Sequence, residues 1–113
     1  MEIHLKYTNL QPSPELKIFI RDKLVFLEKL PLPVGKEVHA WIDIGRTTRH
    51  HQRGLVWYAE CQLRLPGEKT IRATSTNYDL GAAIDEVKDE IELIIRKTRN
   101  KYQENIRRSR RLK

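Results

Sequence analysis

The sequence predicts a two-layer α+β domain in the order β-α-β-β-β-α, with a four-stranded mixed sheet and both helices on one face. Four segments alternate apolar and polar residues, which is typical of half-buried strands. Two longer segments repeat apolar residues at steps of three and four, which is typical of amphipathic helices. A strand, a helix and a second strand in succession favour a parallel pair, and the turns that follow favour antiparallel strands. A chain of 113 residues is expected to form one domain.

The first strand is expected at residues 1–8, where Ile3, Leu5 and Tyr7 alternate with polar residues. A helix then begins after Ser13, because serine caps free backbone amides and the following Pro14 needs no hydrogen-bond acceptor in a first turn. Its apolar stripe has steps of 4, 4, 3 and 3, and Pro31 and Pro33 stop the helix. The stripe consists of Leu16, Ile20, Leu24, Leu27 and Leu30.

The second strand is expected at residues 38–44, with Val38, Ala40, Ile42 and Ile44 on its core side. Residues 45–54 have no period and are interpreted as a flexible basic loop. The third strand covers residues 55–65, with odd-numbered apolar residues facing the core and even-numbered residues, Val56 and Tyr58 among them, facing away. A hairpin turn at residues 66–69 leads into a short fourth strand at residues 70–75.

The last helix is expected from about residue 79 to residue 104, a length of about 39 Å at 1.5 Å per residue. Its apolar stripe has steps of 4, 3, 4 and 3 and consists of Leu80, Ile84, Val87, Ile91 and Ile94. A four-stranded sheet is only about 15–20 Å wide, so the end of the helix is expected to overhang the sheet. We therefore divide the chain into an α+β domain at residues 1–104 and a basic, disordered tail at residues 105–113.

The positive charge of the chain is concentrated at its C-terminus. The total is +7, but residues 96–113 hold nine basic residues and one acid, so this stretch carries +8 and the preceding 95 residues carry −1. Concentrated positive charge indicates a polyanionic partner, nucleic acid before anionic membrane. The first half of the last helix is unsuited to such contact, because residues 85–92 include five acids.

The sequence indicates no enzyme, cofactor or metal site. It has no glycine-rich phosphate loop, no paired carboxylates and no nucleophile constellation. His50 and His51 are adjacent, which is not a standard ligand spacing, and Cys61 falls on the core side of its strand. We therefore assign no metal to these three residues or to His4 and His39. One cysteine, no signal-peptide pattern and no apolar run of about 20 residues predict a cytoplasmic protein without a disulfide or a membrane span.

Residues 79–85, Asp-Leu-Gly-Ala-Ala-Ile-Asp, resemble the Asp-Met-Tyr-Ala-Ala-Ile-Asp signature of the ribosome hibernation promoting factor and ribosome-associated inhibitor A family. Residues 65–73 resemble the turn and fourth strand of that family. Residues 23–24 and 27–30 resemble the end of its first helix, and Arg96, Lys97 and Arg99 resemble the basic end of its second helix. The family fold has the same element order and is related to double-stranded-RNA-binding domains. The long C-terminal dimerisation domain of the family's long form is not found in this sequence, so the chain resembles the short form.

The resemblance implies a monomeric translation inhibitor that binds the small ribosomal subunit, through its rRNA, near the channel for mRNA and tRNA. Such a protein competes with mRNA and tRNA in stress or stationary phase and promotes ribosome hibernation. The expected RNA contacts are Arg21, Lys23, Lys29, Arg72, Arg96, Lys97, Arg99, Lys101, Arg107, Arg108, Arg110 and Arg111. Additional candidates are the basic residues Arg46, Arg49 and Arg53 and, on the open sheet face, Trp41 and Tyr58.

Each candidate also has a structural interpretation. Arg96 is four residues after Glu92 and suits an ordinary helix-stabilising ion pair, and the basic residues of the first helix suit a solvated face. Trp41 and Tyr58 suit cross-strand packing better than base stacking. Two other functions stay open: a general structured-RNA-binding module driven by the basic C-terminus, and a non-enzymatic protein-interaction module that uses Leu93 and the open sheet face. The signature of residues 79–85 is expected to anchor the last helix rather than to touch RNA.

Overall fold

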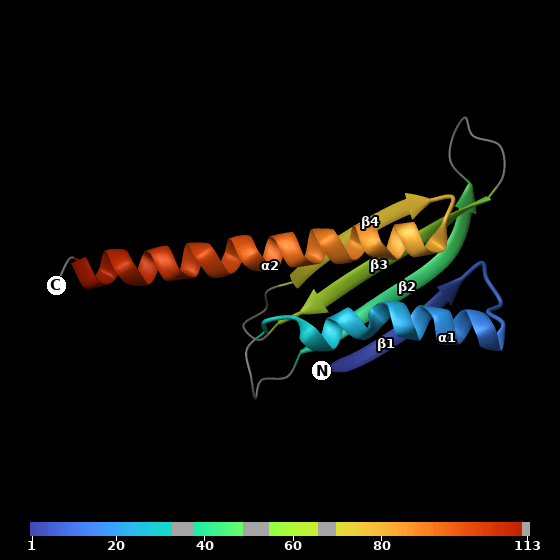
Figure 1. Ribbon diagram of the computed structural model, residues 1–113, viewed down its shortest axis with the longest axis horizontal. Coiled ribbons are helices and arrows are strands. Elements are labelled where there is room, and N and C mark those ends of the chain that lie inside the picture. Colours follow the sequence, from blue (N-terminus) through green and yellow to red (C-terminus); the bar gives the residue numbers. More distant parts are fainter. Residues whose placement is uncertain (33–37, 49–54, 66–69, 112–113) are drawn as a thin grey trace.

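The computed structural model describes residues 1–32, 38–48, 55–65 and 70–111, together with their side chains except those of residues 48, 55 and 99–111. The chain follows the predicted order (Figure 1). Its elements are β1 (Glu2–Thr8), α1 (Pro14–Lys23), the 3₁₀-helix η1 (Leu24–Lys29), β2 (His39–Thr48), β3 (Leu55–Arg64), β4 (Thr70–Asn77) and α2 (Leu80–Arg111).

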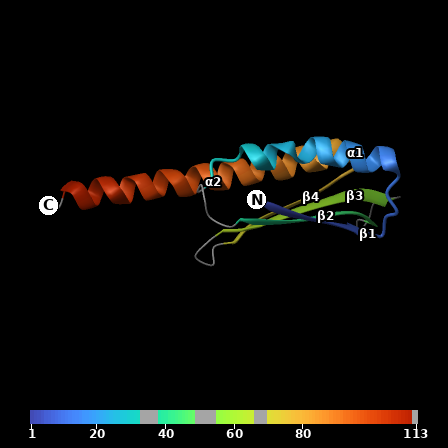
Figure 2. The same ribbon diagram turned by 90° about the horizontal axis from the view of Figure 1, so that it is seen from below.

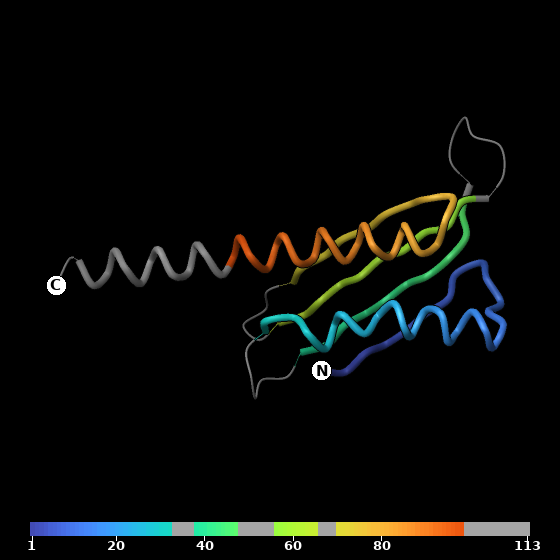
Figure 3. Tube along the Cα trace, in the orientation of Figure 1, coloured from blue at the N-terminus to red at the C-terminus, as the bar shows by residue number. Residues whose placement is uncertain are grey.

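The four strands form one mixed sheet in the order β1-β2-β3-β4. β1 and β2 are parallel, with Glu2 opposite His39 and Thr8 opposite Gly45, whereas β2–β3 and β3–β4 are antiparallel. The trace in Figure 3 leaves β1, passes through α1 and returns as β2, which lies beside β1. Both helices cover the same face of the sheet (Figure 2), so the predicted α+β class and topology are confirmed.

The first helix begins as predicted and ends earlier. The Ser13 side chain accepts a hydrogen bond from the Leu16 amide at 3.1 Å, and Pro14 occupies the first turn. The α-helix stops at Lys23, and η1 continues the segment with the tighter winding that is common at helix C-termini. Most of the predicted stripe still reaches the core: Ile20, Leu24 and Leu27 are buried, while Leu16 and Leu30 are partly buried against it.

The core lies between the sheet and the two helices, and α2 contributes a stripe that differs from the predicted one at its end. Ile95 is buried, whereas Ile94 is only partly buried, because a step of four from Ile91 keeps the side chain over the sheet. Leu93 lies on the outer side of α2 and is exposed. The buried residues of α2 are Leu80, Ala83, Ile84, Val87, Ile91 and Ile95, and those of the sheet are Ala40, Ile42, Ile44, Ala59, Cys61, Leu63, Ile71 and Ala73.

The predicted loop at residues 45–54 is shorter than expected. β2 continues through Thr48, so residues 45–48 belong to the sheet, and the rest of the predicted loop lies outside the described residues. Gly45 suits this strand because a Cβ atom there would lie 2.6 Å from the carbonyl oxygen of Thr8 on β1. Val56 lies on the sheet face away from the helices, as predicted, yet it is buried.

α2 is longer than predicted and includes most of the expected tail. It continues from Leu80 to Arg111, so the expected end at residue 104 and the expected disorder beyond it are corrected for residues 105–111. The physical reason is composition: after Gly81 this segment has no glycine or proline and is rich in arginine, lysine, glutamate and glutamine, which favour helix. Figure 1 shows the C-terminal half of α2 extending past the end of the sheet, as the overhang argument predicted. The division of the chain at residue 104, into a domain and a basic tail, stays a prediction.

Candidate nucleic-acid interface

A groove between η1 and α2 gathers part of the predicted basic site. It has a volume of about 320 Å³, and its charged residues are Lys29 from η1 and Lys88, Glu92 and Arg96 from α2. Its apolar wall is made by Phe26, Leu30 and Pro31. Lys29 and Arg96, which are 67 positions apart in the sequence, therefore line the same hollow because η1 and α2 lie on the same face of the sheet.

The groove cations are available for an anionic partner. Within the described residues, Lys29, Lys88 and Arg96 form no ion pair, and the i,i+4 pair of Arg96 with Glu92 that the spacing suggested does not form. Lys29, Arg96 and the neighbouring Lys97 are exposed. Three cations around one groove attract phosphate oxygens, whereas Glu92 in the same lining reduces this field. Lys88 was missed by the sequence analysis, because the acids around it in the sequence suggested a segment unsuited to RNA.

Lys23 forms an ion pair with Asp85 inside the protein's own fold. Its Nζ lies 3.1 and 3.2 Å from the two carboxylate oxygens of Asp85 on α2, and 6.0 Å from the centroid of the Phe19 ring. Asp85 is the last residue of the signature, so this pair ties α1 to α2. The pair also neutralises a cation that we had expected to contact RNA.

The other polar residues of the signature region hold the start of α2. Asp79 accepts a hydrogen bond from the Ala82 amide at 3.0 Å, and Asn77 accepts one from the Asp79 amide at 2.9 Å. Glu86 accepts hydrogen bonds from the Ser75 hydroxyl and, at 2.9 Å, from the Asn77 amide nitrogen. These contacts cap the helix and attach it to β4, which supports the anchoring role expected for residues 79–85.

Arg21 and Arg46 lie apart from the groove. Arg21 is exposed beside a second hollow, which Ile3 and Leu5 of β1 also line. Arg46 is partly buried on the helix side of the sheet, with its guanidinium 4.4 Å from the centroid of the Trp57 ring. Neither residue joins the surface formed by Lys29 and Arg96.

Arg72 and Tyr58 lie on the open face of the sheet and contact the same carboxylate. Arg72 donates a hydrogen bond to Glu60 at 2.8 Å, and the Tyr58 hydroxyl donates one to the other oxygen of Glu60. Burial, and then the hydrogen bond and the charge of Glu60, raise the pKa of Tyr58 to about 12. Arg72 is thus paired and faces away from the groove, so the structure separates it from the other predicted contacts.

Trp41 packs among polar rings on the same open face. Its ring lies 4.8 Å from that of His4 on β1 and 5.4 Å from that of His39 on β2. The Arg64 guanidinium lies 4.6 Å from its centroid. The cross-strand packing that we expected for Trp41 is therefore present.

The remaining predicted contacts have no described side chains. The backbones of Arg99, Lys101, Arg107, Arg108, Arg110 and Arg111 belong to α2. Arg49 and Arg53 lie outside the described residues. The basic half of α2 nevertheless follows directly from Arg96, so the helix connects the groove with the most basic part of the chain.

The fold, the basic groove and the basic helical extension define a small α+β module with one concentrated basic surface. The chain belongs to the family described as sigma 54 modulation protein / S30EA ribosomal protein, whose model matches residues 3–103. This is a family of ribosome-associated factors rather than a known class of enzyme, and the resemblance carried by residues 79–85 is confirmed. None of the curated proteins matches the chain.

Several solved structures share the fold, among them the following two. The N-terminal domain of Protein Y from Thermus thermophilus is 26% identical, with a TM-score of 0.62, and the match covers 87% of this chain and 99% of that one. A ribosomal subunit interface protein from Coxiella burnetii is 21% identical, with a TM-score of 0.65 and coverage of 88% and 99%. No described helix is long and apolar enough to cross a membrane.

Proposed function

We propose that this protein binds the small ribosomal subunit, through its rRNA, near the mRNA and tRNA channel, and that it inhibits translation there. Occupying the channel competes with mRNA and tRNA and favours hibernation in stress or stationary phase. The protein acts in the cytoplasm, as a monomer before it binds. The observation that carries the proposal is the groove between η1 and α2, where Lys29, Lys88 and Arg96 lack ion-pair partners among the described residues.

The chemistry proposed for the surface is phosphate binding rather than base reading. Lysine and arginine side chains on helices follow the RNA backbone, and double-stranded RNA is recognised mostly through shape and phosphates. The groove provides a short basic surface, and the extension of α2 from Arg96 to Arg111 continues it with further lysines and arginines. Affinity for the subunit is therefore expected to fall steeply with salt.

The test is co-sedimentation with small subunits in a sucrose gradient, in low and in moderate salt. The double variant K29E/R96E is expected to bind more weakly and to lower the salt slope by about one for each lost phosphate contact. K6E/K17E is the matched control, because it makes the same charge change at exposed residues outside the groove. Equal sedimentation of K29E/R96E and the control would remove the groove from the binding surface.

A second function is favoured by the length of α2. Residues 96–111 hold eight lysines and arginines and one acid, and the helix carries them beyond Ile95, its last buried residue. Such a helix binds structured RNA without help from the groove. Deleting residues 107–113 would then abolish binding, and free duplex RNA would compete as well as small subunits do. Under the primary proposal the deletion weakens binding, and subunits compete better than free duplex.

A third function, protein interaction through exposed Leu93 on α2, predicts an association with a protein partner that survives high salt and nuclease. Loss of all binding under either treatment excludes it.

A further inference from the structure

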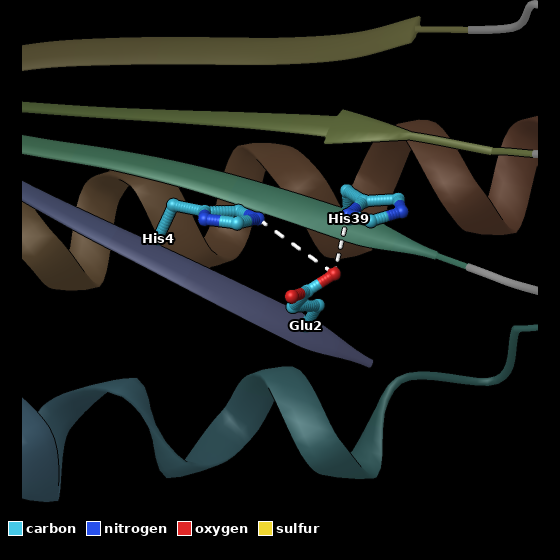
Figure 4. Close-up of side chains that lie close together, drawn as sticks. All are labelled: Glu2, His4 and His39. Carbon is cyan, nitrogen blue, oxygen red and sulfur yellow. Dashed lines mark ion pairs between the residues drawn. The ribbon is translucent and has the colours of Figure 1, made fainter.

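Three potential metal ligands meet at one end of the parallel strand pair, on the sheet face away from the helices. Glu2 and His4 belong to β1 and His39 to β2, and one ligand atom from each lies within 4.8 Å of the others. The carboxylate of Glu2 points toward both imidazole rings (Figure 4). We propose that Glu2, His4 and His39 form a binding site for a divalent transition metal that prefers imidazole, with Zn²⁺ as the best fit.

The backbone fixes this arrangement. Glu2 and His39 are direct partners in the parallel register, and His4 lies two residues after Glu2, on the same face of the sheet. No local spacing in the sequence indicates the site, because His4 and His39 are 35 positions apart and only the pairing of β1 with β2 brings them together.

The distances between the three ligand atoms are close to those around a bound metal ion, so a small movement of the side chains would complete the site. His39 Nδ1 lies 3.1 Å from Glu2 Oε2, and His4 Nε2 lies 4.0 Å from the same oxygen. Ligand atoms at 2.0–2.2 Å from a tetrahedral zinc ion are about 3.4 Å apart. The Glu2 side chain is 62% exposed and can rotate to complete the geometry. Two imidazoles and one carboxylate are a ligand set that zinc accepts, with water in the remaining position.

Both imidazoles are oriented by their surroundings. The His4 ring stacks on Trp41 with an interplanar angle of 17°, and the His39 ring stacks on Trp41 with an angle of 29°. His4 Nε2 is shielded from solvent and makes no hydrogen bond to any described residue, although the residue as a whole is partly exposed. Shielded polar atoms in proteins usually have a partner, and a metal ion would supply one here.

The test is calorimetric titration of the full chain with ZnCl₂, using protein that carries no added histidines. We expect one Zn²⁺ per chain and a loss of affinity of more than about tenfold in H4Q and in H39Q. H50Q/H51Q is the matched control, because it removes the other two of the four histidines, and it is expected to bind Zn²⁺ like the wild type. Buried Cys61 lies on the opposite face of the sheet and does not compete.

A second measurement uses Trp41 as a reporter. In a W57F background Trp41 is the remaining tryptophan, and NiCl₂ is expected to quench its fluorescence unless His39 is replaced. Thermal unfolding without metal verifies that each variant is folded. The proposal fails if wild-type protein binds no Zn²⁺, if H4Q and H39Q bind it normally, or if H50Q/H51Q abolishes binding. Because the site lies on the sheet face away from the groove, H39Q is expected to sediment with small subunits like the wild type, so either proposal can fail alone.

Discussion

The Asp85→Asn substitution separates the two roles that the family signature can have, anchoring α2 or contacting the ribosome. The structure assigns the Asp85 carboxylate to Lys23, whose Nζ lies 3.1 Å from one carboxylate oxygen and 3.2 Å from the other. D85N keeps the shape of the side chain and removes its charge. It therefore releases Lys23 and leaves the groove residues unchanged.

The expected stability effect is small because the pair is exposed. The Lys23 and Asp85 side chains retain 32% and 55% of their accessible surface. Ion pairs of this kind contribute about 0.2–1 kcal/mol, and solvent screening favours the lower half of that range. With an unfolding entropy of about 0.24 kcal/mol/K for 113 residues, 0.5 kcal/mol corresponds to a decrease of about 2 °C in Tm.

The expected effect on the ribosome is unchanged or slightly tighter binding, since Lys23 becomes free to contact phosphate. Small-subunit binding is measured by gradient co-sedimentation, and Tm by circular dichroism on the same protein. E92Q is an informative companion, because it removes the acid from the groove and is expected to strengthen binding. A loss of more than about fivefold in affinity, equivalent to about 1 kcal/mol, in a D85N protein with a nearly normal Tm would show that the carboxylate itself contacts the ribosome.

The other predictions concern the fold and its pH dependence. G45A is expected to lower the free energy of unfolding by about 1–3 kcal/mol in urea titrations, because its Cβ would lie 2.6 Å from the Thr8 carbonyl oxygen; unchanged stability would contradict this crowding. I91A removes most of a fully buried side chain and is expected to cost about 2–5 kcal/mol in the same assay, with a smaller loss indicating that the core collapses around the cavity. Burial raises the pKa of Cys61 to about 12, so iodoacetamide at neutral pH should alkylate it, as seen by mass spectrometry, in unfolded but not in native protein. Folding raises the pKa of Cys61 from 9.0 to about 12 and that of Tyr58 from 10.0 to about 12. Native protein therefore binds more protons than unfolded protein between these limits, and its stability should fall as pH rises from about 9 to about 12. A flat profile of Tm against pH in this range would refute both shifts.

Local pattern was sufficient for most of the fold. Period-2 alternation identified four strands, and Ser13 with Pro14 identified the start of α1, because both signals depend on near neighbours in the chain. Two predictions about the ends of elements were wrong. Composition suggested disorder after residue 104, but strong helix formers continue α2 to Arg111. Residues 45–48 looked like loop, yet they pair with β3, a contact made across the sheet.

The candidate site was predicted less completely than the fold. The sequence shows which residues are charged, but it does not show which of them form ion pairs in the folded protein. Lys23, Arg72 and Arg96 are equally basic in the sequence. The structure pairs Lys23 with Asp85 and Arg72 with Glu60, and it places Arg96 in a groove with Lys29 and Lys88.

The sequence alone determined the fold class, the family and the basic character of the C-terminal helix, because periodicity, a seven-residue signature and net charge are properties of the chain in order. Tertiary structure decided which basic side chains line the groove without an ion-pair partner among the described residues, and it brought His4 beside His39. These outcomes depend on residues 35 to 67 positions apart meeting across a sheet or between packed helices, and no local pattern encodes such distances.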